Sequence, residues 1–411
     1  MKILLVTGNY LPGKNGGIEN YTHWLATLLM HHQCKVEVAA LNVNEESDYV
    51  YEGVKVNYLD GNISAFDKLI KNGHYDICHF HEYSEFGGIE IPWFKKAKEY
   101  VKKLFFTFHL PYLTCYKGDF RFKDVEDCIT FNDAARCVEC VISDKVGYKK
   151  MGESGLYLSS VMGLMKITGK KDQLEKKILA KYQKLNELFA VCDDIFIYAG
   201  WFKEILERNG YNLPNIKKIP YKTKSERDSH SSAIVIDNKK EILPNMKNRM
   251  LFVGRIQHQK GLHLLCKAMG KIETKNIILD VYGNIIDQKY FDNCKESYSF
   301  DFKGTTNYFQ LLEILKEYDF LVLPSVFTEM YSLIIKDAFY EEVPVIASSA
   351  KGNRDAITNG VDGFLFEYDN AEDLAKTIDK AYLLKMNGWK PQFSFPENPQ
   401  KDNEEILSYY R

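Results

Sequence analysis

Residues 250–261 read MLFVGRIQHQKG, and this stretch decides the fold. It begins as an apolar run of strand length, turns at Gly254, presents two cations, Arg255 and Lys260, and ends at Gly261 before a helical pattern. A run that is apolar on both faces and leads through a glycine turn into a helix is typical of parallel sheets covered by helices. The stretch therefore predicts an α/β architecture.

The same alternation of short β-rich runs and helical patterns continues along the chain. A chain of 411 residues is too long for one ordinary core, so we expect two doubly wound units. The expected helices include residues 19–30, 262–269 and 333–340. The expected strands are residues 3–7, 36–41, 54–59, 76–81, 104–109, 195–198, 250–253, 277–282, 320–323, 343–347 and 363–366.

Composition shifts suggest where the units meet. The stretch between Pro214 and Asn248 is polar and rich in Lys and Ser, which is typical of a linker. We therefore expect an N-terminal Rossmann-like domain at 1–215, with a cysteine-containing loop at 110–142. A second Rossmann-like domain is expected at 216–390, followed by a tail and helix at 391–411 that pack back on the N-terminal domain.

Charge, cysteine content and hydropathy indicate a cytoplasmic protein. The formal net charge is -2, so no global basic field points to nucleic acid. The chain starts MKILLVTG, whose apolar run is too short for a signal peptide, and no apolar stretch reaches the ~20 residues of a membrane span. The nine cysteines are an odd number, which favours reduced thiols.

Residues that could carry chemistry follow the first and fifth strands. Residues 12–20 read PGKNGGIEN, so Gly16 and Gly17 open a helix whose free N–H groups suit a phosphate. The alternative is a tight turn without a ligand. His109 ends the fifth strand, where an imidazole can hydrogen-bond a sugar hydroxyl or a developing charge. A structural histidine is the alternative interpretation.

The second half presents a charged set at two strand ends. Arg255 and Lys260 follow one strand and can neutralise a diphosphate; two solvated surface charges are the alternative. Glu329 follows the strand near residue 324, Ser332 lies near a helix start, and Asp337 falls within that helix. Two carboxylates placed in this way can accept hydrogen bonds from sugar and ribose hydroxyls, and the helix N-terminus can hold a phosphate.

These motifs resemble the GT-B-fold retaining glycosyltransferases of glycosyltransferase family 4. The resemblance rests on GGIE at 16–19, HFH at 79–81, His109 and residues 254–261. Its most specific part is residues 329–348, followed by NGVDGFLF at 359–366. The resemblance implies two Rossmann-like domains facing a central cleft, the first on the acceptor side and the second binding a nucleotide sugar.

The resemblance also implies an activity. The enzyme would be a hexosyltransferase-type transferase that moves a sugar from a nucleotide sugar, with a UDP-sugar favoured, to a glycan, glycolipid or other hydroxyl acceptor. It would retain the anomeric configuration without a protein nucleophile, and no catalytic metal is expected. The implied catalytic residues are His109, Glu329, Arg255 and Lys260. The implied donor-binding residues are Gly16, Gly17, Arg255, Lys260, Glu329, Tyr331, Ser332, Leu333 and Asp337.

Departures from the family pattern leave alternatives open. The family's Glu-x7-Glu motif appears as Glu329 and Asp337, and Ser332 stands where Gly is usual. The alternatives are a nucleotide-sugar epimerase or sugar phosphorylase on the same fold, or a non-catalytic sugar-nucleotide binder. The Glu329 and Asp337 pairing favours the transferase, while intact Arg255 and Lys260 argue against a binder without activity.

The expected loop at 110–142 contains four cysteines that have the ligand chemistry of zinc. Cys137 and Cys140 form a Cys-x-x-Cys pair, and Cys115 and Cys128 precede them. Four thiolates from one insertion can make a tetrahedral structural zinc site. Four unrelated reduced cysteines, or a redox-labile pair, are the alternatives.

Residues 144–184 form a basic segment. Ten lysines stand against four acidic residues, interleaved with apolar and aromatic side chains. A basic amphipathic segment can lie on an anionic membrane surface and bring the enzyme to a lipid-linked acceptor at the inner face of the cell membrane. A solvated helical face that covers the N-terminal sheet is the alternative.

Overall fold

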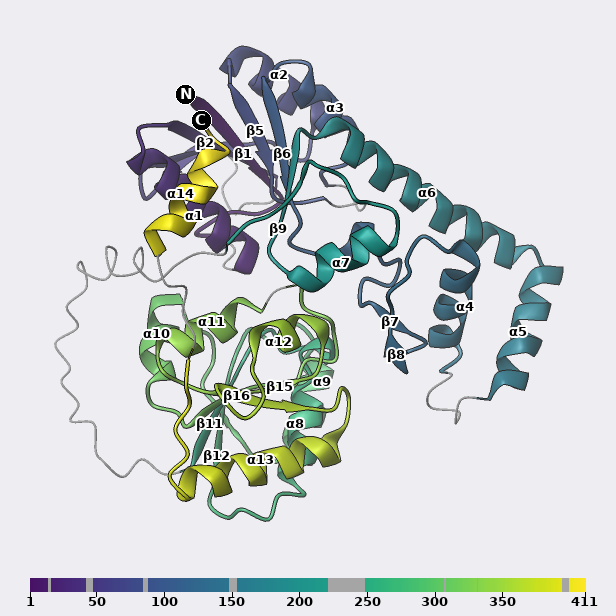
Figure 1. The fold of residues 1–411 in the computed structure, drawn as a ribbon, viewed down its shortest axis with the longest axis vertical. Helices are drawn as coiled ribbons and strands as arrows, with labels where there is room; N and C mark the ends of the chain where they lie inside the picture. Colours follow the sequence, from purple (N-terminus) through teal and green to yellow (C-terminus); the bar gives the residue numbers. More distant parts are fainter. Residues whose placement is uncertain are drawn as a thin grey trace. The chain divides into compact units, whose positions relative to one another are not determined.

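The computed structural model describes residues 1–13, 16–41, 47–83, 88–147, 154–220, 248–306, 308–330, 332–393 and 399–411. The chain divides into two compact units (Figure 1). Met1–Lys222 and Asp402–Arg411 form the first unit, and Thr223–Lys401 forms the second. Each unit is an α/β domain built around its own sheet.

The sheet of the first unit has eight strands among the described residues, in the order β10-β9-β6-β5-β1-β2-β4-β3. All neighbours pair in parallel except β3, which is antiparallel to β4. The strands are β1 (Lys2–Thr7), β2 (Lys35–Ala40), β3 (Tyr49–Tyr51), β4 (Val54–Tyr58), β5 (Ile77–Phe80), β6 (Lys103–Thr107), β9 (Asp194–Ile197) and β10 (Ile216–Lys218). The six strands expected in this half are therefore confirmed.

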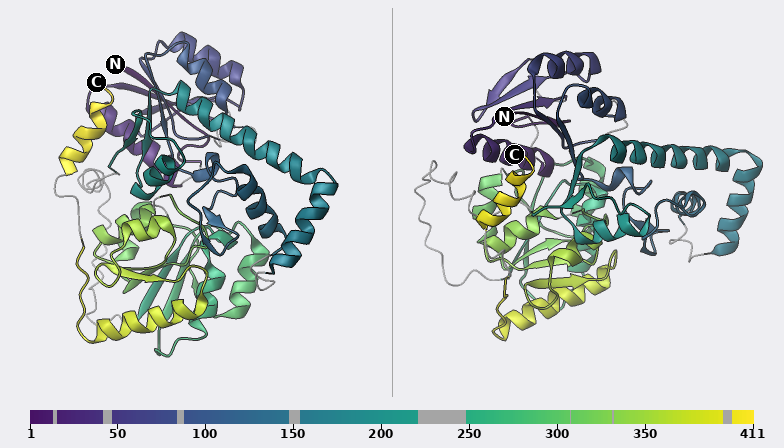
Figure 2. Two further views of the ribbon diagram at one scale, coloured as in Figure 1. Left: turned by 45° about the vertical axis from the view of Figure 1, so that its right-hand side comes forward. Right: turned by 45° about the horizontal axis from the view of Figure 1, so that its top comes forward.

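Helices and a small cysteine-bearing region surround this sheet. The helices α4, α5 and α6 pack on one another, and α6 also packs against α3 (Figure 2). The elements are α1 (Gly17–His31), α2 (Ile63–Gly73), α3 (Ile91–Lys98), η1 (Pro111–Leu113), β7 (Arg121–Phe122), β8 (Glu126–Asp127), α4 (Ala134–Lys145), α5 (Gly155–Ile167), α6 (Lys170–Val191), α7 (Gly200–Arg208) and α14 (Pro399–Ser408).

The sheet of the second unit has six strands among the described residues, in the order β13-β12-β11-β14-β15-β16. All neighbours pair in parallel. The strands are β11 (Arg249–Val253), β12 (Ile278–Tyr282), β13 (Asp301–Phe302), β14 (Phe320–Leu323), β15 (Val345–Ser348) and β16 (Gly363–Phe366). The helical elements are η4 (His258–Lys260), α8 (Leu262–Met269), α9 (Gln288–Ser297), α10 (Tyr308–Leu315), α11 (Leu333–Tyr340), α12 (Lys351–Ala356) and α13 (Ala371–Met386).

Both faces of the second sheet are buried, as the apolar strand runs predict. Along β11, Phe252 belongs to a core cluster that also contains residues of α8, α9 and α13. The neighbouring Leu251 belongs to another cluster, which contains residues of α10 and α11. Successive side chains point to opposite faces of a strand, so helices on both sides exclude water from this sheet.

The expected domain boundaries need correction. The second domain does not begin at 216, because β10 pairs in parallel with β9 and so belongs to the first sheet. The tail at 391–411 is divided, since Asp402–Arg411 joins the first unit while the preceding residues belong to the second. The Nζ atom of Lys103 donates to the backbone oxygen of Tyr409 at 3.1 Å, which ties this segment to β6.

The region at 110–142 is not a simple loop. It contains η1, the short hairpin of β7 and β8, and most of α4. The helix starts where it does because the Asp133 side chain accepts a hydrogen bond from the backbone N–H of Arg136 at 3.0 Å. Such a cap satisfies one of the free N–H groups at a helix start.

Candidate functional site

The strand order of the second sheet places its candidate site between β11 and β14. The chain moves outward from β11 through β12 to β13, then returns to the other side of β11 with β14. Ligands of open parallel sheets bind at the carboxyl ends of strands, where the strand order reverses. Arg255 and Lys260 follow β11, and Glu329 follows β14. The topology therefore brings these three predicted residues to one edge.

Gly261 lets the two strand ends approach closely. Its φ is +75°, a conformation that strains residues with a side chain. A Cβ atom at this position would lie 1.8 Å from the backbone oxygen of Pro324, which follows β14. Gly261 also precedes α8 directly. A glycine is thus required both by the turn and by the contact with the neighbouring strand end.

The loop that carries Glu329 is fixed by several neighbours. The backbone N–H of Val326 donates to the backbone oxygen of Gln259 at 3.0 Å, and the Ser348 hydroxyl donates to the backbone oxygen of Ser325 at 2.8 Å. A Cβ atom on Gly352 would lie 2.1 Å from the Glu329 backbone oxygen. The ends of β11, β14 and β15 therefore support one another.

Lys260 and Glu329 form an ion pair at this edge. The Nζ atom of Lys260 donates to Oε1 of Glu329, and the two side chains are 27% and 21% exposed. The Ser325 hydroxyl lies 3.5 Å from the same carboxylate oxygen. Arg255 is exposed, and within the described ranges its guanidinium makes no hydrogen bond or ion pair. This edge of the sheet therefore carries one exposed cation, Arg255, and one cation in an ion pair, Lys260.

The helix α11 completes this edge. Ser332 is its N-cap residue, and its side chain makes no capping hydrogen bond, so the N–H groups of Leu333 and Ile334 have no side-chain cap, while the N–H of Ile335 donates to the Ser332 backbone oxygen at 3.2 Å. Leu333 begins the helix, and Asp337 is buried one turn further on. Tyr331, which was also predicted to bind the donor, lies outside the described residues.

The first sheet has a corresponding switch between β1 and β5. The chain moves from β1 to β2 and β4 on one side, and from β5 to β6 and β9 on the other. Gly16 is the N-cap residue of α1 and Gly17 begins that helix, without a capping side chain. The glycines predicted to approach a phosphate therefore stand at a helix start after β1.

A pocket of about 290 Å³ lies at this edge of the first unit. His81 and His109 both line it, and Nδ1 of His81 lies 3.2 Å from Nε2 of His109. Glu82 also lines it and accepts a hydrogen bond from the backbone N–H of Gly8 at 2.9 Å. The lining residues are Ile18, His81, Glu82, Tyr83, Phe106, Thr107, Phe108, His109, Leu110 and Leu113.

Glu82 is a polar residue of this pocket that the sequence analysis missed. A Cβ atom on Gly8 would lie 2.3 Å from a carboxylate oxygen of Glu82, so the glycine after β1 makes room for it. The signal available in the sequence was its position directly after the HFH motif, at the end of a strand beside the switch point.

Three histidines of this unit, His79, His81 and His109, have lowered pKa values. Burial lowers the pKa of His109 to about 3. Burial also holds the pKa values of His79 and His81 well below the usual range, and neighbouring histidines lower them further. Neutral imidazoles can accept as well as donate hydrogen bonds, so His109 can serve either role toward a sugar hydroxyl.

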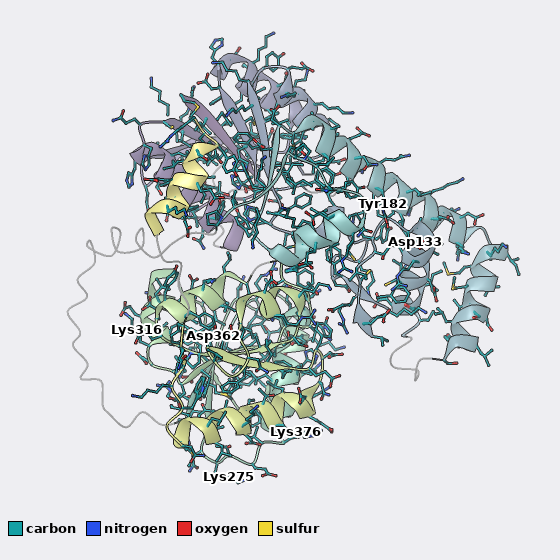
Figure 3. All side chains as sticks on the ribbon, viewed as in Figure 1. Asp133, Tyr182, Lys275, Lys316, Asp362 and Lys376 are labelled. Atoms are coloured by element: carbon teal, nitrogen blue, oxygen red, sulfur yellow. The ribbon has the colours of Figure 1, made fainter. Side chains whose placement is uncertain are left out.

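The four cysteines predicted to bind zinc line a second pocket of the first unit. Asp133 at the start of α4 and Tyr182 on α6 belong to this region (Figure 3). Across the described part of the chain, no three or more His, Cys, Asp and Glu side chains stand where they could hold a metal ion together. Cys115, Cys128, Cys137 and Cys140 therefore share a pocket, but their sulfurs are not in ligating positions.

The basic segment at 144–184 consists mainly of α5 and α6, joined at Gly169. Lys181 does not belong to an exposed basic face, because it is buried and its Nζ atom lies 3.5 Å from the Cys115 backbone oxygen. Lys149 and Lys150 lie outside the described residues. None of the described helices is long and apolar enough to cross a membrane.

Part of the chain matches a known protein family. Residues 235–392 match the family described as Glycosyl transferases group 1. The match covers most of the second unit, including Arg255, Lys260, Glu329 and Asp337. The charged set between β11 and β14 thus lies in the part of the chain that resembles sugar-transferring domains.

Two glycosyltransferase relatives match part of this chain. An uncharacterised glycosyltransferase of Methanocaldococcus jannaschii is 29% identical over 165 residues, 39% of this chain and 41% of the relative. The Escherichia coli UDP-Gal:alpha-D-GlcNAc-diphosphoundecaprenol alpha-1,3-galactosyltransferase is 30% identical over 153 residues, 34% of this chain and 39% of the relative. The alignments thus span less than half the length of these relatives.

Similarity of fold extends over the whole chain. The crystal structure of Anabaena HepE in complex with UDP and glucose matches with a TM-score of 0.60 at 13% identity, over 100% of this chain and 99% of that one. The two Rossmann-like domains are therefore those of the GT-B fold, as the sequence predicts. The group 1 match and this fold together support a glycosyltransferase in general terms.

Proposed function

We propose that the protein transfers a sugar from a nucleotide sugar to a hydroxyl acceptor, with retention of the anomeric configuration. The observation that carries the proposal is the ion pair of Lys260 and Glu329 at the switch point of the second sheet, with Arg255 following the same strand as Lys260. Two cations suit a diphosphate leaving group, and a carboxylate suits sugar hydroxyls. These residues lie within the domain that matches group 1 glycosyl transferases.

We favour a UDP sugar as the donor. HepE was crystallised with UDP and glucose, and the E. coli relative is named for UDP-Gal. Arg255 and Lys260 would neutralise the diphosphate together with the open N-terminus of α11, and Asp337 would contact the ribose. Glu329 would bind hydroxyls of the sugar. His109 would contact the transferring sugar, and Gly17 would approach the diphosphate.

Retention would follow from positioning without a protein nucleophile. In the proposed reaction, the bond from the anomeric carbon to the diphosphate oxygen breaks as the acceptor oxygen attacks on the same face. The leaving diphosphate takes the acceptor's proton, and the transition state is oxocarbenium-like. The protein contributes orientation and neutralisation of charge. NMR of the product would show the donor's anomeric configuration, and an inverted product would refute this mechanism.

The first test is donor binding. UDP, GDP and ADP sugars should be compared by thermal shift, since a ligand at 100 times its dissociation constant adds about 2.7 kcal/mol of stability. Arg255→Gln should weaken binding of the preferred donor about tenfold or more, because a charge-assisted contact is lost. Lys275→Gln is the matched control, because Lys275 is exposed and precedes β12 at the opposite end of the strands (Figure 3).

The second test is turnover, which also separates the alternative functions. Release of UDP that depends on an acceptor supports transfer. A phosphorylase would require free phosphate, and an epimerase would change the donor sugar without an acceptor. Tight binding without release of UDP or any change in the sugar would leave a non-catalytic binder. No structural observation favours any of these three alternatives over transfer.

We further propose that the acceptor is lipid-linked and that the protein works at an anionic membrane surface on the cytoplasmic side. The helix α5 supports this, because Leu156, Leu164 and Ile167 are 86%, 62% and 85% exposed. Exposed lysines lie on α5 and on the helix that follows it, α6. They are Lys166 on α5 and Lys170, Lys176 and Lys177 on α6. Apolar side chains next to lysines are typical of helices that lie in the interface of anionic bilayers.

Liposome co-sedimentation tests the membrane proposal. The protein should bind vesicles that contain an anionic lipid, and binding should fall with salt and with vesicles of neutral lipid alone. A Leu156→Ser, Ile167→Ser variant should bind weakly while keeping its affinity for the donor. Val50→Ser is a control, since Val50 is 68% exposed on β3. Equal sedimentation of all three proteins at low salt, or none at all, would refute the membrane proposal.

A further inference from the structure

His81 is a buried imidazole at the ligand edge of the first sheet. It follows β5 directly, is 1% exposed and lines the pocket of the first unit. Its backbone N–H donates to the Val6 backbone oxygen at 2.8 Å, which holds it beside the end of β1. Since the strand order reverses between β1 and β5, His81 lies where a ligand of this sheet is expected.

The orientation of the His81 ring is fixed by its neighbours. The ring of His79 lies against it with the two centroids 4.1 Å apart, and the ring of Tyr21 lies 5.8 Å away. His79 is itself held by hydrogen bonds to the hydroxyls of Tyr410 and Thr107. The imidazole of His81 is therefore oriented before a ligand arrives, which reduces the entropy cost of binding.

The two ring nitrogens of His81 have different surroundings. Nδ1 lies 3.2 Å from Nε2 of His109. Nε2 is buried and has no hydrogen-bond partner within the ranges that the structure describes. Buried polar atoms nearly always have a partner, because burying one without a hydrogen bond is costly. A ligand in the pocket that His81 lines would supply the missing partner.

The contact between His81 and His109 couples what the two rings offer to a ligand. Burial holds both pKa values below the usual range, so at pH 7 each ring is neutral and carries one proton. If Nε2 of His109 donates to Nδ1 of His81, then Nε2 of His81 is a donor and Nδ1 of His109 is an acceptor. In the opposite arrangement these two roles are exchanged. The pair thus always offers one donor and one acceptor, which suits a hydroxyl group because a hydroxyl can both donate and accept.

The rest of the pocket is suited to a sugar ring. Glu82 adds a carboxylate, whose position is fixed by the hydrogen bond from the backbone N–H of Gly8 at 2.9 Å. Phe106 and Phe108 contribute apolar walls. Small-molecule pockets typically combine such walls with a few precisely placed polar groups. A sugar presents both an apolar C–H face and hydroxyl groups, so it matches this lining.

We propose that Nε2 of His81 binds a hydroxyl group of a sugar in this pocket, as a second sugar-binding histidine beside His109. This rests on the proposed function, since it names a further residue that binds a sugar of that reaction. The hydroxyl belongs either to the sugar of the donor or to the acceptor, and the experiments distinguish these two sources.

Two substitutions separate the roles of the two nitrogens. The amide in His81→Asn takes the place of Nδ1, so the contact with His109 is kept and the ligand contact is lost. The amide in His81→Gln takes the place of Nε2, so the reverse holds. We expect His81→Asn to weaken sugar binding about fivefold, the effect of one lost hydrogen bond, and His81→Gln to weaken it less. His32→Asn is the matched control, because His32 is exposed. A larger loss in His81→Gln would overturn the proposal, since His81 would then act only by holding His109.

Calorimetry and kinetics identify the source of the hydroxyl. If it belongs to the donor, His81→Asn should lose affinity for the UDP sugar and keep its affinity for UDP. If it belongs to the acceptor, both affinities should stay and the KM for the acceptor should rise. Three unchanged values would overturn the proposal. A wild-type chain that binds no nucleotide sugar would instead refute the proposed function, and free sugars would then test His81.

Nitrogen-15 NMR of the histidine rings keeps the proposal testable in that case, or if His81→Asn does not fold. The full wild-type chain is titrated with UDP-glucose and, separately, with free glucose and free galactose. The ring signals of His81 and His109 should shift together, while those of His32 should not move. Ring signals of His81 that stay unchanged in all three titrations would overturn the proposal.

Discussion

Lys260 forms an ion pair with Glu329, 69 residues later in the chain, across the ends of β11 and β14. In the proposed function these two side chains serve different parts of the donor, the diphosphate and the sugar. In the structure they pair with each other instead. Donor binding would therefore redirect Lys260 from the carboxylate to the diphosphate and free Glu329 for sugar hydroxyls. The pair keeps both charges in place before the donor arrives.

This relationship gives the first prediction, for Glu329→Gln. The amide cannot hold Lys260 as strongly, so Lys260 is more available to a diphosphate. We expect the variant to bind bare UDP as well as the wild type or more tightly. Its turnover should fall by a factor of about 100, because a contact to the sugar in the transition state is lost. Calorimetry with UDP and steady-state kinetics measure the two quantities.

The control is Glu313→Gln, which removes another paired carboxylate. Glu313 accepts a hydrogen bond from Lys316 at 3.0 Å on the exposed face of α10. This variant should keep both UDP affinity and turnover. Equal losses of UDP affinity and of turnover in Glu329→Gln would contradict the assignment of Glu329 to the sugar.

The second prediction concerns Gly261→Ala. A methyl group there meets both the strained φ of +75° and the Pro324 oxygen at 1.8 Å. Gly304 has a φ of +77°, but a Cβ atom added there would meet nothing within 4 Å. Gly304→Ala therefore measures the cost of the positive φ alone, without a steric clash. We expect Gly304→Ala to cost about 1 kcal/mol and Gly261→Ala at least twice as much.

Thermal unfolding of the two variants measures this difference. Gly261→Ala should also weaken donor binding, because it displaces the ends of β11 and β14 that carry Lys260 and Glu329. Gly304→Ala should leave donor binding unchanged. If both variants lose the same stability, the close approach of the two strand ends does not constrain Gly261.

The third prediction is that turnover does not need an added divalent ion. The diphosphate is neutralised by Arg255, Lys260 and a helix N-terminus in the proposed site, so charge compensation comes from the protein. Activity should persist in EDTA over short times, and adding Mg²⁺ or Mn²⁺ afterwards should change the rate little. An inactive enzyme in EDTA that recovers fully with Mg²⁺ would show that a metal does part of this work.

Much of the fold could be predicted from the sequence because short runs that are apolar on both faces and alternate with helical patterns are typical of parallel sheets. The runs at β1 and β5, for example, are almost fully buried. The short strand β10 could not be predicted in the same way, since Ile216–Lys218 has one buried residue. Only its pairing with β9 shows that it belongs to the first sheet.

The candidate site was predictable in its residues but not in its internal contacts. Positions after parallel strands indicate which side chains reach the ligand edge, and this placed Arg255, Lys260 and Glu329. The ion pair between Lys260 and Glu329 depends on side-chain geometry across two strands, which spacing does not encode. Spacing also does not show which lysines of the basic segment are buried. Lys181 is one of them, and it lies beside Cys115.

The last prediction is that the first unit loses stability in mild acid. Histidine has a pKa of about 6.5 in an unfolded chain, whereas burial lowers the pKa of His109 to about 3 in the folded protein. His79 and His81 are shifted in the same direction. Below pH 6.5 the unfolded chain therefore binds protons that the folded chain does not. The contribution of these neutral histidines to the free energy of unfolding is therefore fully present above pH 6.5. It is lost as the pH falls toward 3, the pKa of His109 in the folded protein.

The surroundings of these histidines hold them neutral. His79 is fully partnered, since its ring nitrogens lie 2.5 Å from the Tyr410 hydroxyl and 2.8 Å from the Thr107 hydroxyl. His109 lies among the rings of Tyr21, His81 and Tyr198. A proton on any of these imidazoles would place a charge where little water can reach it. The shift of His109 alone should lower the stability by about 2 kcal/mol at pH 5 relative to pH 7, and His79 and His81 act in the same direction.

Thermal unfolding between pH 7 and pH 5 tests this, because most carboxylates remain ionised over that range. The transition of the first unit should move to lower temperature as the pH falls. In His109→Gln the shift should be smaller, since one of the contributions is removed. His32→Gln should behave like the wild type, because His32 is exposed. An unfolding temperature that does not change from pH 7 to pH 5 would mean that these histidines can take up protons without cost in the folded chain.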